Sequence, residues 1–95
     1  MKNKLPVENV GDTDVCLFIE PYGEDYWLKP GDVFEVTPLS DAYVQFSVAV
    51  ANDLFTVWLY EDGDPYNALL DYEVAAANGD KLECGHQRPA DSGGG

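Results

Sequence analysis

The only histidine of the chain, His86, stands two residues after Cys84, and this pair is the first candidate for chemistry. On one β-strand the two side chains would share a face, where a thiolate and an imidazolium could act as a nucleophilic pair. A strand-end histidine beside a small buried cysteine is the simpler explanation of the same residues. Because no Gly-x-Ser-x-Gly motif is present, we do not expect acyl transfer.

Metal ligands are the second possibility. Cys16, Cys84 and His86 are zinc ligands by type, but the paired Cys-x-x-Cys spacing of structural zinc sites is missing. The carboxylates of residues 61–64, Glu-Asp-Gly-Asp, could bind calcium weakly, although no EF-hand pattern surrounds them and Asp-Gly-Asp is typical of a hairpin turn. We predict no metal and no cofactor.

Acids and aromatic rings gather between Glu20 and Trp27. Two carboxylates beside aromatics that stack on a sugar are what glycoside hydrolysis requires. A chain of 95 residues offers little depth for a cleft that would raise the pKa of one acid. We therefore predict that this region binds without catalysing and that the protein is not an enzyme.

Binding needs only a surface with rings for stacking and groups for hydrogen bonds. We expect Trp27 in the core, where aromatics dominate small β-proteins. Trp58 is expected on the surface, because its strand face also carries Gln45 and Ser47. The candidate ligand or interface residues are Glu20, Tyr22, Glu24, Tyr26, Trp27, Gln45, Trp58 and Tyr60.

The elements that must position these residues are short strands separated by turn residues. Residues 15–20 carry apolar side chains on both faces, which is typical of a strand covered on two sides. Pro30-Gly31 suits the centre of a type II turn between strands at 26–29 and 33–37. About seven such strands predict an all-β fold, a small antiparallel β-sandwich or barrel.

The clearest hairpin joins residues 45–50 to 55–60 through an Asn52-Asp53 loop. A single register places its aliphatic pairs on one face, which we expect to be the core face. A charge at Val48 should then unfold the domain. The aligned pairs are Val50–Phe55, Val48–Val57, Phe46–Leu59, Ala49–Thr56, Ser47–Trp58 and Gln45–Tyr60.

Residues 65–77 fit either a helix or a strand. Asp64 as N-cap before Pro65 favours a helix, whereas alternation on both sides of a 78–80 loop favours a hairpin. We favour a turn or one short helical piece over 65–71, followed by a hairpin. Its expected pairs are Val74–Cys84, Ala76–Leu82 and Tyr72–His86.

Residues 1–86 are expected to form a single all-β domain, and the polar residues 87–95, which end in three glycines, a flexible tail. The acids number 18 against five lysines and arginines, a net charge of −13 that repels phosphate backbones and anionic lipids. We therefore expect neither nucleic acid nor a membrane as partner. The N-terminal residues lack an apolar leader, so we expect a cytoplasmic location with reduced cysteines.

Two phrases carry a resemblance to known proteins. Residues 17–26, Leu-Phe-Ile-Glu-Pro-Tyr-Gly-Glu-Asp-Tyr, and residues 28–36, Leu-Lys-Pro-Gly-Asp-Val-Phe-Glu-Val, resemble a set of small uncharacterised bacterial all-β proteins. Those proteins share an acidic Glu-Pro-aromatic-Gly turn ahead of a Pro-Gly turn. The Pro-Gly-Asp turn is also similar to that of cupins, which implies an architecture only, because the metal histidines of cupins are missing.

These observations favour a non-enzymatic, acidic β-module that acts through protein–protein interaction or homodimerisation. The alternative is a module that binds a small neutral ligand or a carbohydrate on its Tyr/Trp and carboxylate surface.

Overall fold

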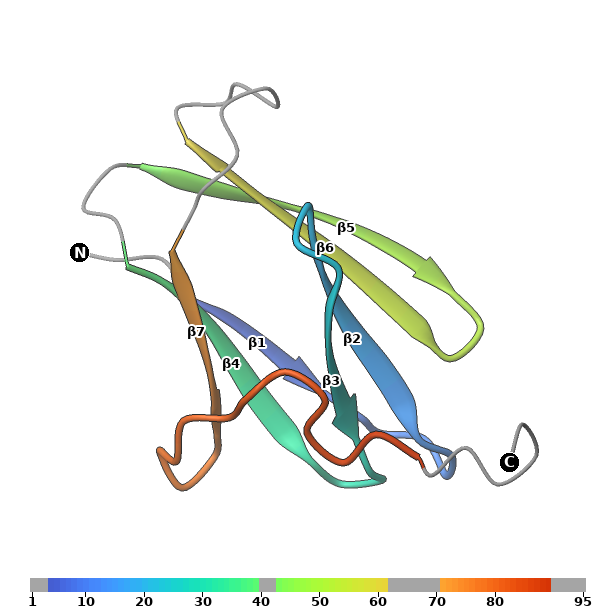
Figure 1. Cartoon of the computed structure of the whole chain (residues 1–95). Coiled ribbons are helices and arrows are strands. Elements are labelled where there is room, and N and C mark those ends of the chain that lie inside the picture. The colour runs from blue at the N-terminus through green and yellow to red at the C-terminus, as the bar shows by residue number, and fades with distance from the viewer. Residues whose placement is uncertain (1–3, 40–42, 62–70, 90–95) are drawn as a thin grey trace.

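Two β-sheets face one another in the computed structural model, which describes residues 4–39, 43–61 and 71–89 (Figure 1). The strands are β1 (Leu5–Glu8), β2 (Val15–Glu20), β3 (Glu24–Leu28), β4 (Val33–Pro38), β5 (Val44–Ala51), β6 (Leu54–Glu61) and β7 (Tyr72–Ala76). One sheet has the order β1-β4-β7 and the other the order β3-β2-β6-β5. The predicted small all-β sandwich is confirmed. All pairs are antiparallel except β2–β6, which is parallel.

The core lies between the two sheets because inward-facing residues alternate with outward-facing ones along each strand. On β2, Leu17 and Ile19 face inward and are fully buried, whereas Phe18 faces outward and is only partly buried. The other buried apolar residues of this core are Val7, Tyr26, Leu28, Phe34, Val36, Val44, Val57, Leu59, Val74 and Leu82. The expected second cover on the outer face of β2 is partial, because Cys16 on that face is buried whereas Phe18 is only partly buried.

The Pro30-Gly31 turn forms as predicted between β3 and β4. The Asp32 N–H donates to the Lys29 carbonyl over 2.9 Å, which closes a four-residue turn. Gly31 has a φ of +88°, the left-handed conformation that the third position of a type II turn requires. This turn aligns the inner faces of β3 and β4, one in each sheet.

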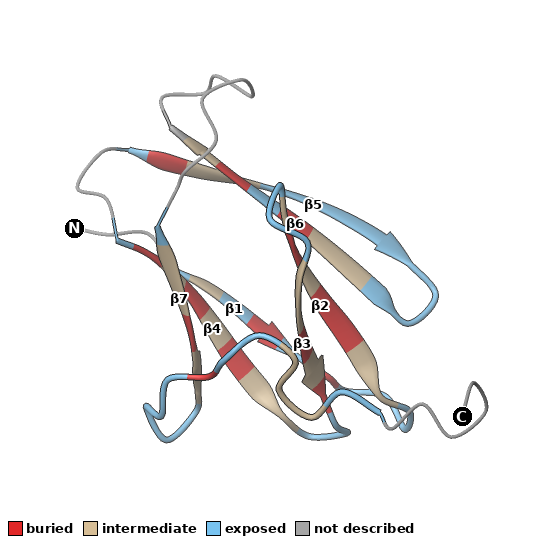
Figure 2. Cartoon of the chain, in the orientation of Figure 1, coloured by how far each residue is buried: buried red, intermediate tan, exposed pale blue. Residues whose placement is uncertain are grey.

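The predicted register of the β5–β6 hairpin is confirmed in every pair, from Gln45–Tyr60 to Val50–Phe55. The prediction that its whole aliphatic face is core is wrong. Val57 and Leu59 are buried, but Val48 is 41% exposed and Val50 is 64% exposed. Figure 2 shows the exposed second half of β5 in pale blue. The reason is that the opposing sheet has three strands and β5 is the edge strand of a sheet of four.

The predicted register of the second hairpin is also wrong. The Leu82 N–H donates to the carbonyl of Val74 over 2.7 Å, so Val74 lies beside Leu82 rather than Cys84. A tight turn causes this shift of two residues, because the N–H of Gly79, at a φ of +93°, already donates to the Ala76 carbonyl.

The chain beyond this hairpin leaves β7 for the other sheet. Gly85, with a φ of +87°, turns it toward β3, where His86 bridges to Tyr26 and not to Tyr72. Tyr72–Ala76 is a strand, which decides that part of the helix-or-strand alternative. The short helical piece predicted over 65–71 lies almost wholly outside the described residues.

Candidate interaction surface

Three tyrosines and one acid form a cluster where β3 meets β7. The Tyr72 hydroxyl donates to the Glu24 carboxylate and lies 3.1 Å from the hydroxyl of Tyr26. The ring of Tyr22 stacks on that of Tyr72, with centroids 6.1 Å apart. Burial, followed by the hydrogen bonds with Glu24 and Tyr26, raises the pKa of Tyr72 far above its usual value. These contacts join the two sheets, and sequence reasoning missed Tyr72 because it lies 48 positions from Glu24.

The predicted platform of Tyr22, Tyr26 and Trp27 is divided between two faces. Tyr26 points into the sandwich and is buried, whereas Trp27 lies on the outer face of β3 and is partly exposed. The expectation of a core position for Trp27 is therefore wrong. Consecutive strand residues point to opposite faces, so Tyr26 and Trp27 cannot share a binding surface.

The outer face of the four-stranded sheet carries the remaining candidates. Trp58 is 39% exposed, as predicted, and stands between Glu20 on β2 and Ser47 on β5. Gln45 and Tyr60 form the next pair along the hairpin. Glu20, Gln45, Trp58 and Tyr60 thus lie on one face, where an indole ring, a carboxylate and an amide are neighbours.

On this face an ion pair between Arg88 and Asp25, which we call the clamp, fixes the C-terminal segment to β3. The Nε of Arg88 donates to Asp25 over 2.7 Å, and a second guanidinium nitrogen contacts the same carboxylate. The Trp27 indole also donates to Asp25, over 2.8 Å. The hydrogen bonds from Arg88, helped by that of Trp27, hold the pKa of Asp25 well below its usual range although burial opposes them. Arg88 and Gln87 belong to the predicted tail, so the ordered chain extends beyond residue 86.

The proposed pair of Cys84 and His86 does not share a strand face. The Cys84 thiol donates to Asp25 over 3.6 Å, and the His86 ring packs edge-on against Phe34 with centroids 5.5 Å apart. The turn at Gly85 separates them. Among the described residues no three His, Cys, Asp or Glu side chains converge as metal ligands, and Asp62 to Asp64 lie outside those residues.

Three of the four sheet edges are protected against pairing with another strand. The edge of β3 is covered by the C-terminal segment, since the backbone N–H of Trp27 donates to the His86 carbonyl over 2.9 Å. The edge of β7 is occupied likewise, since the Ala76 N–H donates to the Asp80 carbonyl over 2.9 Å. The edge strand β1 has four residues and contains Pro6, which cannot donate a backbone hydrogen bond. Proline, short length and covering segments are the usual protections of an edge strand.

The fourth edge, β5, has none of these protections within the described part of the chain. It is eight residues long and reads Val-Gln-Phe-Ser-Val-Ala-Val-Ala, without a charge or a proline. β5 pairs with β6 alone among the described strands. A long, uncharged, half-exposed edge presents N–H and C=O groups to another strand. The uncharged run could have indicated this edge from the sequence, but only the sheet order shows which side of the hairpin is open.

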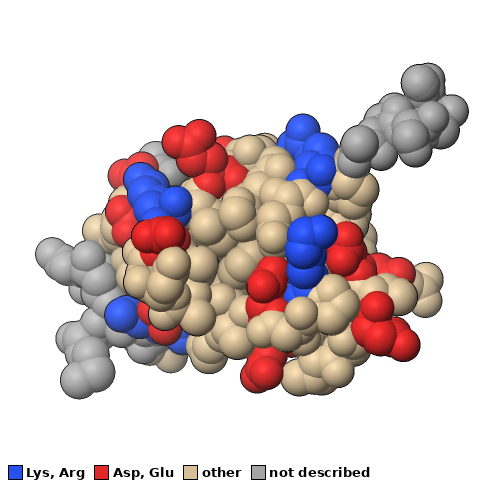
Figure 3. Space-filling view, turned by 90° about the horizontal axis from the view of Figure 1, so that it is seen from below, with Lys and Arg blue, Asp and Glu red and all other residues tan. Residues whose placement is uncertain are grey.

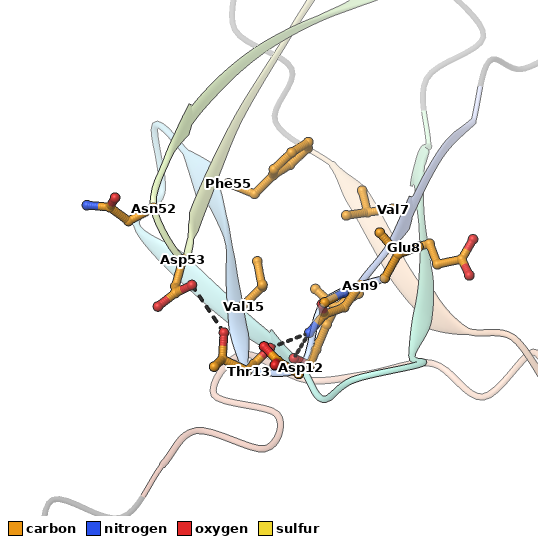
Figure 4. Close-up of a pocket in the computed structure, with 12 residues that line it drawn as sticks. Val7, Glu8, Asn9, Asp12, Thr13, Val15, Asn52, Asp53 and Phe55 are labelled. Atoms are coloured by element: carbon orange, nitrogen blue, oxygen red, sulfur yellow. Dashed lines mark hydrogen bonds between the residues drawn. The ribbon is translucent and has the colours of Figure 1, made fainter.

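One cavity of about 260 Å³ opens between the sheets beside the β5–β6 turn (Figure 4). Its apolar lining includes Val7, Val15 and Phe55, which point into it in Figure 4. Asn9 at its edge is buried, and its amide donates to the carbonyls of Thr13 and Leu28 over 2.7 and 3.0 Å. Because the described side chains leave no buried polar atom unpaired, the cavity shows no group that calls for a ligand.

The acidic charge is dispersed over one face of the molecule. On the face seen in Figure 3, acidic side chains are spread over the surface and the basic ones lie among them. No helix in the described segments is long and apolar enough to cross a bilayer.

Comparisons of the chain with protein-family models, curated proteins and solved structures find no match.

Proposed function

We propose that this protein is a non-enzymatic binding module that accepts a β-strand of a protein partner on the open edge of β5. The observation that carries this proposal is the contrast between β5 and the other three edges. A proline or a covering segment blocks each of those, whereas β5 pairs on one side only within residues 43–61 and the other described ranges. In strand addition, main-chain hydrogen bonds supply affinity and pockets for alternate side chains supply specificity.

The charge of the protein sets the kind of partner. With a net charge of −13, it attracts basic segments, does not repel neutral ones and repels phosphate-rich surfaces, so we propose neither nucleic acid nor membrane as partner. Val48 and Val50 on β5 offer an apolar contact for alternate side chains of an added strand. Both cysteines are free, which fits the reducing cytoplasm that we propose as its location.

A displayed library of short peptides tests strand addition even though the partner is unidentified. The library is selected on wild type alone, and the enriched peptides are then measured against Val48→Lys, because a lysine on an edge strand opposes pairing. We expect enriched peptides with alternating apolar residues, neutral or basic charge, and weaker binding to Val48→Lys. The control is Val10→Lys, which changes an exposed valine outside β5. Peptides that bind wild type and Val48→Lys equally would contradict the proposal.

Carbohydrate binding at Trp58 is the second candidate. The specific observation is the exposed indole of Trp58 directly beside Glu20 in the β2–β6 register. Sugars stack on such rings while a carboxylate accepts their hydroxyl hydrogen bonds. A ¹H–¹⁵N correlation spectrum resolves the two indole N–H groups. Movement of the Trp58 peak on addition of an oligosaccharide would support this candidate, provided that the spectrum of Trp58→Ala does not change with the same sugar. A Trp58 peak that moves with no sugar of the panel would contradict it.

A further inference from the structure

We infer that the strand which β5 accepts is β5 of a second copy of this chain, paired antiparallel with Val48 of one copy opposite Val48 of the other. This inference rests on the proposed function and names its partner. It joins two four-stranded sheets into one continuous sheet of eight strands across a two-fold axis.

The side-chain pattern of β5 fits itself in this register. Pairing about Val48 places Phe46 opposite Val50 of the second copy, and Ser47 opposite Ala49. Inward-facing residues therefore meet inward-facing residues, which an odd shift of register would prevent. The half-exposed valines at 48 and 50 gain apolar neighbours that the smaller opposing sheet does not give them.

The backbone fits the same register. In an antiparallel ladder every second residue directs its N–H and C=O away from the neighbouring strand. The hairpin has a two-residue loop and closes on the pair Ala51–Leu54, so the outward groups of β5 belong to every second residue from Val44 to Val50, of which Phe46, Val48 and Val50 enter the proposed pairing. Pairing about Val48 brings these three residues of the two copies together, and their N–H and C=O groups form about six hydrogen bonds across the axis.

Charge explains why two acidic copies can meet along β5. No acid or base occurs from Val44 to Ala51, so no like charges stand opposite one another in the paired strands. The net charge of −13 on each copy still opposes association at long range, and salt at physiological ionic strength screens that repulsion at separations beyond about 8 Å. The dimer should therefore strengthen as salt is added.

Sedimentation equilibrium of wild type, Val48→Lys and Val48→Glu tests the register. We expect wild type to dimerise more strongly in high salt, and each variant alone to dimerise about tenfold more weakly or worse, because like charges then meet at the axis. An equimolar mixture of the two variants should regain the dimer, since lysine then faces glutamate. The Val10→Lys control should dimerise as wild type does.

The other outcomes separate this inference from the proposed function. If Val48→Lys dimerises like wild type, the dimer uses another surface and the inference is overturned. If wild type stays monomeric while library peptides still bind it in a Val48-dependent way, the inference fails and strand addition stands. If neither association is seen, both fail. Correlation spectra of both variants should show that they remain folded, as the exposure of Val48 predicts.

Discussion

The carboxylate of Asp25 and the guanidinium of Arg88 hold each other from 63 positions apart in the chain. The pair fixes the segment around His86 to the outer edge of β3, where the backbone of Trp27 also binds it. The Asp25 carboxylate of β3 thus helps to close a sheet edge.

Acid should weaken this clamp. The folded-state pKa of Asp25 is lowered by the hydrogen bonds from Arg88, whereas an unfolded aspartate has a pKa of about 3.9. The stability from this pair is therefore present above the unfolded pKa and is lost as pH falls through the folded one. We expect the melting temperature of wild type to fall more steeply than that of Asp25→Asn below about pH 4. Parallel curves for the two proteins would show that the clamp adds nothing to stability.

Two valines that face each other across the hairpin should respond differently to the same change. Val57 is fully buried and Val48 is not, although the two are directly paired. Val57→Asp should prevent folding, because burying an unpaired carboxylate costs several kcal/mol of the small net stability of a domain. Val48→Asp should leave the monomer folded. Circular dichroism melts at low protein concentration measure both, and loss of the fold in Val48→Asp would place Val48 in the core after all.

The two thiols should differ in reactivity. Burial, with a smaller contribution from Asp25, raises the pKa of the Cys16 thiol to about 11, and Cys84 is exposed. Because the thiolate is the reactive form, a disulfide reagent at neutral pH should label Cys84 quickly and Cys16 only on unfolding. Cys84→Ser should remove the fast phase, and Cys16→Ser the slow one. Two fast phases in the native wild type would contradict this assignment.

The stability of the folded protein at high pH should depend on Tyr72. Burial raises its folded-state pKa, so the stability that depends on its neutral form is present below the unfolded pKa of about 10 and is lost as pH rises above it. Above about pH 10 the melting temperature of Tyr72→Phe should therefore fall less steeply with rising pH than that of wild type. At neutral pH the variant should lose about 1 kcal/mol of unfolding free energy, because the hydrogen bond to Glu24 is removed. Tyr43→Phe, at an exposed position, is the control and should match wild type. Equal slopes for wild type and Tyr72→Phe would show that the hydroxyl is not part of the folded network.

Local patterns in the sequence determined the strands and the near contacts. Alternation and an Asn52-Asp53 loop sufficed for every pair of the β5–β6 register, because a slip by one residue would turn each side chain to the opposite face. Proline and glycine at positions 30 and 31 sufficed for the turn, since their φ preferences match its geometry.

Only the tertiary structure decided which faces are covered. Alternation says that Val48 and Val57 share a face, but the width of the opposing sheet decides that Val57 is buried and Val48 is not. Likewise, the positions of Arg88, Trp27 and Tyr72 depend on contacts between segments 46 or more positions apart. Such contacts form when whole sheets pack, and no short-range pattern in the chain encodes their partners.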